Sequence, residues 1–402
     1  MFFSMSYRKL LVLPAKESYN KTIIWHPEKG AAVGRGDSMT NLMDGLTIKM
    51  ANFSIGGDEV YRLIGEYCAP FGKTAVVIGG PIAMSKARRA MEKGMEGGPV
   101  SVSEWFDFGG ECCWEKVDEL TEEEAVKKAD MIFGVGGGKA IDTAKMTAGK
   151  LGKPFFTFPT IASTCAAVTM IAAMYEPDHK FHGLGQFHHP AQHSFINARI
   201  IAESPSVYMW AGIGDSIAKY YESRLSARGL DVGYNNMMGM DITNMVNKPL
   251  MDIAVQAVKD NEAKKDTREV REAILHIIIS TGYASLFLDT DMNSCAAHAV
   301  NFGLMEIPSV HEGHYHGEMV AFGLLVMFLM DGNMKDFETV YHFNRSMGLP
   351  TRLDDFGITA DELPRICEKA SDTLDIRVMP YKVTPEMYMD AFKKLAAYNE
   401  TH

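Results

Sequence analysis

The sequence has no hydrophobic run long enough to cross a membrane. Its most apolar stretch, residues 319–330, is interrupted by Gly323 and is well short of the ~20 residues that a membrane-spanning helix needs. The start of the chain lacks the positively charged region and the small-residue cleavage site of a secretory signal. We therefore expect a soluble protein with no membrane partner.

Cysteine and positive charge are both scarce. The 6 cysteines form no regular framework, because Cys112 and Cys113 are adjacent and no two cysteines are separated by two residues, so we expect a reducing, cytoplasmic location. The chain has 40 lysines and arginines against 51 aspartates and glutamates, a net charge of −11. With no basic run to follow a phosphate backbone, nucleic acid is not an expected partner.

What the chain does have is an alternation of strand-like and helix-like segments in its first half. Strand patterns at 74–80, 131–135 and 154–159 alternate with helical patterns at 84–93, at 121–128 and after Lys139. This alternation predicts βαβ units and a doubly wound parallel sheet. A hairpin is expected around 175–180, and a last short strand at 194–196.

The second half of the sequence has a helical period throughout. Apolar residues recur at helical spacing, separated by short polar breaks, over residues 213–224, 250–259, 267–288, 294–304 and 316–330. We therefore predict three parts: an N-terminal extension (1–50), an α/β dinucleotide-binding domain (51–205) and an all-helical metal-binding domain (206–402). Ligands usually bind in the cleft between two such domains.

Three consecutive glycines follow the strand at 131–135. Gly136, Gly137 and Gly138 carry no Cβ, so the backbone can approach a ligand closely, and the helix that follows directs free N–H groups and a positive dipole at it. This arrangement suits a pyrophosphate. A glycine run alone also fits a simple strand-to-helix turn.

The helical half contains a carboxylate and two histidines that are suited to metal binding. Asp215 lies at the start of a predicted helix, where it could also act as a cap. His298 lies among small apolar residues, and His316 closes a short histidine-rich loop. One aspartate and two histidines are suitable ligands for a divalent metal, and three protein ligands leave a position open for a substrate.

These motifs give the chain a marked resemblance to a known family. From about residue 53 to its end, it resembles the glycerol dehydrogenase branch of the iron-containing (group III) alcohol dehydrogenase superfamily, whose fold is shared with dehydroquinate synthase. The matching motifs occur in the family's order: Gly-Gly-Gly-Lys-Ala-Ile-Asp at 136–142, Pro-Thr-Ile-Ala-Ser-Thr at 159–164, Gly-Asp-Ser at 214–216, Ala-His at 297–298 and His-Gly-Glu at 316–318.

The resemblance implies an activity and a set of site residues. The activity is metal-dependent hydride transfer between NAD(P) and a small alcohol or polyol, in a homo-oligomer. Asp215, His298 and His316 would bind the metal and carry catalysis, and His311 or His314 could relay a proton. Cys165 and Asp215 would face the substrate. The implied cofactor-binding residues are Gly137, Gly138, Lys139, Asp142, Thr160 and Ser163.

Two departures from the family pattern concern the metal and the substrate. Lys219 stands where iron-type members have a further histidine ligand, so we expect zinc rather than iron. Cys165 replaces an aspartate that faces polyol hydroxyls, and a thiol is only a weak donor and acceptor. A less polar alcohol, an aldehyde or a hydroxyketone then becomes the expected substrate, in a pocket with Thr169 and Met170. Alternatively, Cys165 merely packs.

The nucleotide end of the cofactor is less clearly specified by the sequence. No acidic residue follows the strand at 74–80 to bind a ribose 2′-hydroxyl, and Ser85, Lys86 and Arg88 lie nearby. NADP is therefore admissible, although NAD is slightly favoured. A histidine-rich segment at 179–193 has no defined ligand spacing, so we expect an exposed hairpin there rather than a second metal site.

Three other functions compete with an alcohol dehydrogenase. A dehydroquinate synthase-type sugar-phosphate cyclase or lyase would need a glutamate at position 215 and a set of basic residues for the substrate phosphate, and neither is visible. An sn-glycerol-1-phosphate dehydrogenase stays possible. The intact set of Asp215, His298 and His316 argues against a non-catalytic binding protein.

Overall fold

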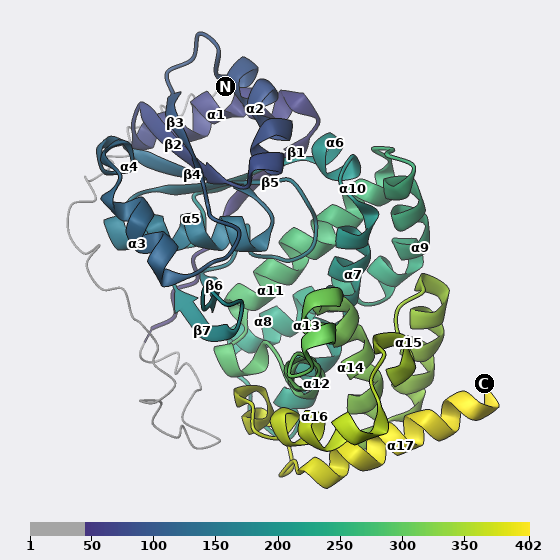
Figure 1. Ribbon diagram of the computed structural model, residues 1–402. Coiled ribbons are helices and arrows are strands. Elements are labelled where there is room, and N and C mark those ends of the chain that lie inside the picture. The colour runs from purple at the N-terminus through teal and green to yellow at the C-terminus, as the bar shows by residue number, and fades with distance from the viewer. Residues whose placement is uncertain (1–44) are drawn as a thin grey trace, which may run out of the picture.

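The computed structural model describes residues 45–402; residues 1–44, which make up most of the expected N-terminal extension, lie outside the described part. The first half of the described chain folds around a parallel sheet with helices on both faces (Figure 1). The six strands run in the order β1-β8-β5-β4-β2-β3, and every pairing is parallel. Their bounds are β1 Asn52–Gly56, β2 Thr74–Gly79, β3 Ser101–Asp107, β4 Met131–Gly136, β5 Phe155–Pro159 and β8 His193–Asn197.

Alternate side chains of the central strands pack into two different cores. Val77 of β2 and Phe133 of β4 lie in the core beneath α1 and α2, whereas Val76 and Ile132 lie in the core that contains α3 and α5. This is the alternation that a sheet covered on both faces requires. The helices of this half are α1 Ile64–Cys68, α2 Pro81–Met95, α3 Trp114–Glu122, α4 Glu124–Lys128, α5 Gly138–Leu151 and α6 Ala198–Ala202.

The order of the strands reverses between β2 and β4. The chain runs from β2 outward to β3, and then returns to place β4 on the other side of β2. Ligands of doubly wound sheets bind at such a switch point, beyond the carboxyl ends of the strands. Here those ends carry Gly79, Asp107 and Gly136.

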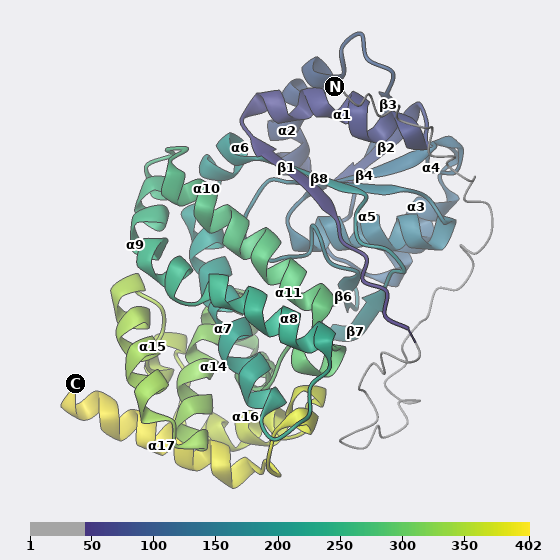
Figure 2. The same ribbon diagram turned by 180° about the vertical axis from the view of Figure 1, so that it is seen from behind.

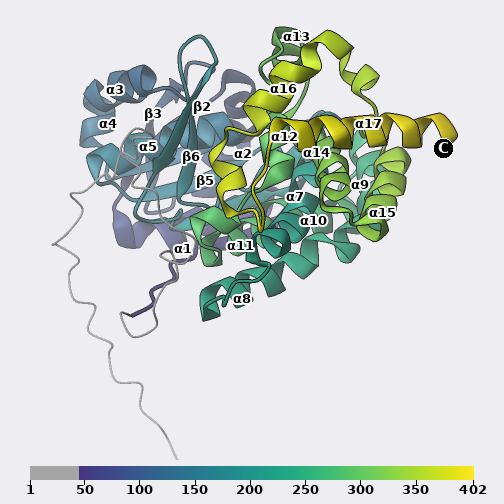
Figure 3. The same cartoon turned by 90° about the horizontal axis from the view of Figure 1, so that it is seen from below.

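The second half is entirely helical, with α14 packed against α7, α12, α15 and α17 (Figure 1). Seen from below, α16 and α17 lie across one side of this bundle (Figure 3). Across residues 45–402, no helix combines the length and the apolar character that a bilayer crossing requires. The bounds are α7 Ser206–Ala227, α8 Tyr234–Ile242, α9 Lys248–Glu262, α10 Arg268–Ile274, α11 Thr281–Phe287, α12 Ala296–Leu304, α13 Pro308–Gly313, α14 His316–Asp331, α15 Met334–Met347, α16 Leu363–Ala370 and α17 Pro385–Thr401.

The two halves meet along one edge of the sheet, where β1 lies beside β8 (Figure 2). The hydroxyl of Tyr283, on α11, donates a hydrogen bond of 2.6 Å to the carbonyl of Ala51, directly before β1. The Tyr283 ring also contacts Phe53, with 6.2 Å between ring centroids. The edge strand is thus fixed to the helical half.

The predicted fold class is confirmed, although several elements differ from the prediction. The edge strand β3 was missed, because its residues are mostly polar and exposed. The helix expected over 121–128 is two helices, since Glu123 is extended between α3 and α4. The helix expected over 267–288 contains a π-helix at Leu275–Ser280.

The histidine-rich segment only partly forms the expected hairpin. Strands β6 (Ile171–Tyr175) and β7 (Phe181–Gln186) pair antiparallel, with His179 and His182 exposed between and along them. The expectation of exposure is wrong for His193, which belongs to β8 and is only 2% exposed. Its ring stacks on Tyr67 with 4.0 Å between centroids, and its Nε2 lies 3.0 Å from Ser54 Oγ.

His193 should make the protein less stable in acid. Burial lowers its pKa to about 4. Below pH ~6.5 the ring of His193 is therefore protonated in the unfolded chain but still neutral in the folded chain. Stability should be complete above pH ~6.5 and fall by about 3 kcal/mol as the pH drops to ~4. Urea unfolding of wild type and His193→Gln at several pH values measures this. If the free energy of unfolding depended on pH in the same way in wild type and His193→Gln, the prediction would be wrong.

Candidate metal centre and cofactor loop

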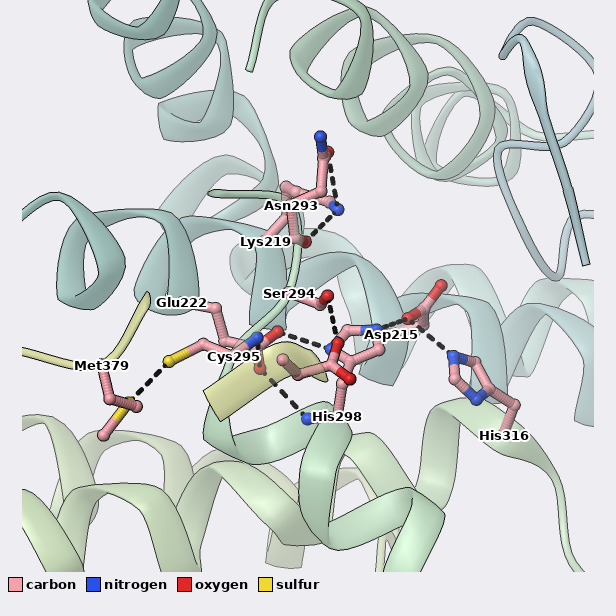
Figure 4. Close-up of polar contacts among 10 residues, drawn as sticks. Asp215, Lys219, Glu222, Asn293, Ser294, Cys295, His298, His316 and Met379 are labelled. Atoms are coloured by element: carbon pink, nitrogen blue, oxygen red, sulfur yellow. Dashed lines mark hydrogen bonds and ion pairs between the residues drawn. The ribbon is translucent and has the colours of Figure 1, made fainter. Parts of the chain in front are cut away.

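Three helices bring the predicted metal ligands together. Asp215 on α7, His298 on α12 and His316 at the start of α14 offer one ligand atom each, and these atoms all lie within 4.8 Å of one another. Asp215 Oδ1 is 3.5 Å from His298 Nε2 and 3.4 Å from His316 Nε2. Figure 4 shows both imidazoles directed at this carboxylate. The site is largely buried, with only the His316 side chain substantially exposed, at 45%.

Asp215 does not cap a helix, which corrects the simpler interpretation of this residue. Helix α7 begins at Ser206, directly after Pro205, so Asp215 lies well inside it. Burial opposes ionisation of its carboxyl, but the two neighbouring imidazoles, His298 and His316, outweigh burial and hold the pKa of Asp215 well below its usual range. The carboxylate is therefore charged and available to a cation.

Glu222 orients His298 and was not anticipated from the sequence. It is fully buried, and its Oε2 lies 2.6 Å from His298 Nδ1. Its Oε1 accepts hydrogen bonds from the backbone N–H groups of Cys295 (2.8 Å) and His298 (3.1 Å). When a cation is bound, donation of the Nδ1 hydrogen to Glu222 would leave the Nε2 lone pair of His298 for the cation beside Asp215, as in carboxylate–histidine–metal arrangements. Two turns separate Glu222 from Asp215 on the same helix face, which is the pattern that could have revealed it.

Each ligand lies next to a point where two helix backbones touch. A methyl group on Gly214 would lie 2.6 Å from the carbonyl oxygen of Gly317, and one on Gly317 would overlap the carbonyl of Ala211. Helices α7 and α14 therefore cross with backbone against backbone, which places Asp215 opposite His316.

The second crossing involves α12 and α14. A methyl group on Gly323 would overlap the carbonyl oxygen of Ala297, the residue before His298. At the start of α14, Glu318 Oε1 accepts a hydrogen bond from the N–H of Tyr315 and so caps the helix. In the His316-Gly-Glu motif, the histidine is thus a ligand, the glycine permits the crossing and the glutamate caps.

The ligand geometry fits a small divalent cation. Ligand atoms bound at ~2.0–2.1 Å in a tetrahedron lie ~3.4 Å apart, close to the 3.4 and 3.5 Å that separate Asp215 Oδ1 from the two imidazole nitrogens. These separations are too long for good hydrogen bonds. The three residues are therefore arranged around a shared point rather than bonded to one another.

Lys219 is turned away from this point. Its ammonium donates to the backbone carbonyl of Asn293 and to Asn293 Oδ1, the latter at 3.2 Å (Figure 4). The predicted relay histidines are not members of the ligand group: His314 Nδ1 is 3.3 Å from Glu318 Oε1, and His311 lies on α13. A proton relay through either histidine stays a prediction.

The glycine loop follows β4, at the switch point of the sheet. Gly136 has φ +147°, a conformation that L side chains rarely adopt, and α5 begins at Gly138. A methyl group on Gly137 would lie 2.5 Å from Ile161 Cδ1, and one on Gly138 would lie 3.1 Å from Thr164 Oγ1. The loop is therefore packed against residues 159–164, where the backbone N–H of the buried Thr160 donates to Gly136 O at 3.1 Å.

The two polar residues predicted to bind the cofactor from α5 already have protein partners. Lys139 Nζ lies 2.6 Å from Glu111 Oε2. Asp142 is buried, with Oδ1 2.7 Å from Lys145 Nζ and Oδ2 accepting from the N–H of Ala173 at 3.0 Å. Asp142 thus supports the loop from within the fold. The N–H groups at the start of α5 are the donors that remain for an anion.

The cofactor loop and the metal helix are joined by one close contact. A methyl group on Gly212 of α7 would lie 2.6 Å from the carbonyl of Ala162 and 3.0 Å from Ser163 Cα. Residues 159–164 therefore touch the glycine loop on one side and the helix of Asp215 on the other. This contact fixes the separation between the two parts of the site.

Comparisons with known proteins agree with this architecture. Residues 52–194 match the family model described as iron-containing alcohol dehydrogenase. A glycerol dehydrogenase from Thermotoga maritima is 31% identical over 305 residues, covering 72% of this chain and 81% of that protein. Hydroxycarboxylate dehydrogenase A from Escherichia coli K12 is 29% identical over 296 residues, covering 72% and 81%. The crystal structure of a probable glycerol dehydrogenase from Sinorhizobium meliloti 1021 superposes with a TM-score of 0.76 at 28% identity, covering 89% of this chain and 99% of that one.

The fold and these relatives define a metal-dependent, NAD(P)-linked oxidoreductase that acts on the CH–OH group of an alcohol or polyol. The chain belongs to the iron-containing alcohol dehydrogenase family, in its glycerol dehydrogenase branch, as the resemblance predicted. The comparisons give no support to a sugar-phosphate cyclase or an sn-glycerol-1-phosphate dehydrogenase.

Replacing Glu222 should weaken metal binding without removing a ligand. Glu222→Gln keeps the size of the side chain but removes the charge that holds the Nδ1 hydrogen of His298. We expect metal affinity to fall ~10- to 100-fold, measured by competition with a chelator of known affinity. Wild-type affinity in a folded Glu222→Gln protein would contradict this role.

Adding one methyl group at the α7–α14 crossing should disrupt the site. In Gly317→Ala the new Cβ overlaps the Ala211 carbonyl, so the helices must separate and His316 must move away from Asp215. We expect metal content and activity to fall at least ~10-fold and the melting temperature to fall. Gly313→Ala is the matched control, because a methyl group there meets no atom within 4 Å. If Gly317→Ala and Gly313→Ala lost equal amounts of metal and activity, the α7–α14 crossing would not be the cause of the loss.

Proposed function

We propose that the protein is an NAD-dependent dehydrogenase of a small alcohol that uses zinc held by Asp215, His298 and His316. The observation that carries the proposal is the convergence of these three ligand atoms within 4.8 Å. One of them, on Asp215, belongs to α7, the helix that touches the loop beside the glycine run. Residues 51–205 would then act as the cofactor domain and residues 206–402 as the metal domain.

When bound, a metal held by Asp215, His298 and His316 would supply a Lewis acid for the substrate hydroxyl, and a bound NAD would supply the hydride acceptor. The chain's own groups position these partners. Asp215, His298 and His316 hold the metal, and Glu222 fixes the orientation of the His298 ring. The N–H groups of Gly138 and Lys139 at the start of α5 bind the pyrophosphate, while Thr160 and Ser163 line the path toward the nicotinamide.

Two features favour zinc over iron. The distances of 3.4 and 3.5 Å from Asp215 Oδ1 to the imidazole nitrogens are those expected of two ligands at zinc–ligand bond lengths. Lys219, where iron-type members carry a further histidine, is engaged with Asn293. Two imidazoles and one carboxylate are a common zinc set.

NAD is favoured over NADP by an acidic residue on β3. Asp107 ends β3 directly beside Gly79 of β2, one strand away from the switch point, where the adenosine ribose would lie. Its Oδ1 accepts from the N–H of Gly109 at 2.9 Å; a carboxylate here would repel a 2′-phosphate. Of the cationic groups that could bind that phosphate, Arg88 pairs with Glu92 at 2.8 Å.

The substrate pocket would include the half-buried Cys165. Burial raises the pKa of its thiol, so the residue is uncharged and offers little to a row of hydroxyls. A small alcohol, or the corresponding aldehyde or ketone, fits this better than glycerol. We also propose that the enzyme works in the cytoplasm, which its 6 free cysteines favour, and as a homo-oligomer, which the family resemblance implies.

The test is NADH and NADPH formation by zinc-loaded enzyme on a panel of small alcohols and polyols. We expect turnover with NAD at least ~10-fold above that with NADP, and its loss in His298→Ala, because one of the three ligands is gone. Asp107→Ser should lower the ratio of turnover with NAD to turnover with NADP. Glu104→Ser, an exposed position on the same strand, serves as its matched control.

Each part of the proposal can fail separately in this assay. A wild-type preference for NADP would overturn the cofactor assignment. If iron restored activity and zinc did not, the assignment of zinc would be wrong. An active, metal-bound His298→Ala would show that the ligand set is wrong.

A further inference from the structure

A buried carboxylate beside the cofactor loop has two side-chain donors on one of its oxygens. Glu111 follows β3 and is only 5% exposed. Its Oε1 accepts a hydrogen bond from the N–H of Cys112 at 3.0 Å, and its Oε2 lies 2.6 Å from Lys139 Nζ and 2.9 Å from His179 Nδ1. A buried carboxylate without a side-chain partner is costly. One of the two donors can therefore leave Glu111 readily only while the other stays.

The two donors come from different parts of the fold. Lys139 is the second residue of α5, directly after the glycine run, and its ammonium lies 5.0 Å from the centre of the Tyr175 ring. His179 lies in the turn between β6 and β7, and β6 packs against α5, so the hairpin lies below α5 in the view of Figure 1. The turn of the hairpin thus reaches the end of α5 at which the pyrophosphate is expected.

The backbone around His179 is held in an unusual conformation. His179 has φ +71°, and across residues 45–402 only Lys264 is another non-glycine residue with a positive φ. Such a conformation persists only where the surrounding structure fixes it. The N–H of His179 donates to the carbonyl of Glu176 at 2.9 Å, and Phe181 packs against Phe302 of α12 with 5.3 Å between ring centroids. The hairpin and the helical half together hold the imidazole at Glu111.

Of the two donors, Lys139 is the one that a bound cofactor would attract. Its side chain is 49% exposed and can turn away from Glu111. The N–H groups at the start of α5 would hold the pyrophosphate next to it, and the two negative charges of a pyrophosphate attract an ammonium more strongly than one carboxylate does. His179 can stay at Glu111, because an imidazole can donate from Nδ1 in its neutral and in its charged form.

We propose that His179 takes over Glu111 when the cofactor binds, so that the Lys139 ammonium is free to bind the pyrophosphate. His179 and Glu111 are then positioning residues that act on the cofactor through Lys139. The inference rests on the proposed cofactor site at the start of α5. It accounts for the pairing of Lys139, a predicted cofactor-binding residue, with a carboxylate, and it gives the turn of the histidine-rich hairpin a role in cofactor binding.

The test measures the affinity of the zinc-loaded protein for ADP-ribose, the part of NAD that carries the pyrophosphate, by calorimetry. His179→Gly removes the imidazole, and glycine adopts the positive φ without strain. We expect this variant to bind ADP-ribose at least ~5-fold more weakly, because Glu111 is left without a side-chain donor when Lys139 turns away. Lys139→Met should weaken binding at least ~10-fold. His182→Ala is the matched control, because this hairpin histidine pairs with Glu176 instead, and its affinity should equal that of wild type.

A second background distinguishes an exchange of partners from a merely structural role of His179. In Glu111→Gln no carboxylate competes for Lys139, so ADP-ribose should bind at least as tightly as to wild type. In this background His179→Gly should change the affinity less than ~2-fold, since its effect depends on the carboxylate. The proposal is wrong if His179→Gly weakens binding equally with and without the Glu111 carboxylate, or if Glu111→Gln alone weakens it.

The same measurements separate this inference from the proposed function. If wild type did not bind ADP-ribose, the proposed cofactor site would be wrong and the inference would fall with it. If wild type and His179→Gly bound ADP-ribose equally well, the inference alone would be wrong. Melting temperatures of the variants check that the hairpin and the sheet stay folded.

Discussion

The close approach of the α7 and α14 backbones is the constraint on which the metal centre depends. Side chains normally keep helix axes 8–10 Å apart, but glycines at 214 and 317 let the two backbones touch. The ligands stand immediately beside this contact, Asp215 after Gly214 and His316 before Gly317. Because the backbones are so close, the short side chains of an aspartate and a histidine are long enough to meet. The α12–α14 crossing adds His298 by the same means.

The same device connects the metal to the cofactor. Gly212 lies one turn before Asp215 on α7 and touches the backbone at Ala162 and Ser163. Residues 159–164 in turn pack against Gly137 and Gly138 of the phosphate-binding loop. A hydride can move only between atoms held close together. Backbone contacts, which involve few flexible side chains, are well suited to fixing the distance between the metal site and the cofactor loop.

Much of the fold and of the metal site could be predicted from the sequence, and the features that could not share a physical cause. The alternating strands and helices, the glycine run and the Asp215, His298 and His316 set are local patterns, and the fold they predicted is the one observed. Asp215 was open to misinterpretation as a cap because its helix continues back to Pro205 through apolar residues. The spacing of Glu222 from Asp215 places both on one face of α7, but its bonds to Cys295 and His298 are contacts between distant segments that this spacing does not reveal.

Strand β3 and His193 illustrate the same limit. An edge strand is half exposed, so β3 lacks the apolar run that identifies buried strands, and with it Asp107 was missed. His193 belongs to a histidine-rich segment whose composition suggests exposure, yet its ring is enclosed by Tyr67 and Phe195. Composition describes a segment as a whole, whereas burial is decided residue by residue.

The spread of the ligands over α7, α12 and α14 has a thermodynamic consequence. An unfolded chain does not hold Asp215, His298 and His316 together, so a cation that binds all three binds the native state alone. Its free concentration then enters the folding equilibrium, and at 100 times its dissociation constant it adds about 2.7 kcal/mol to the free energy of unfolding. The abundance of metal around the protein would thus help to set the fraction of molecules whose helical half is folded.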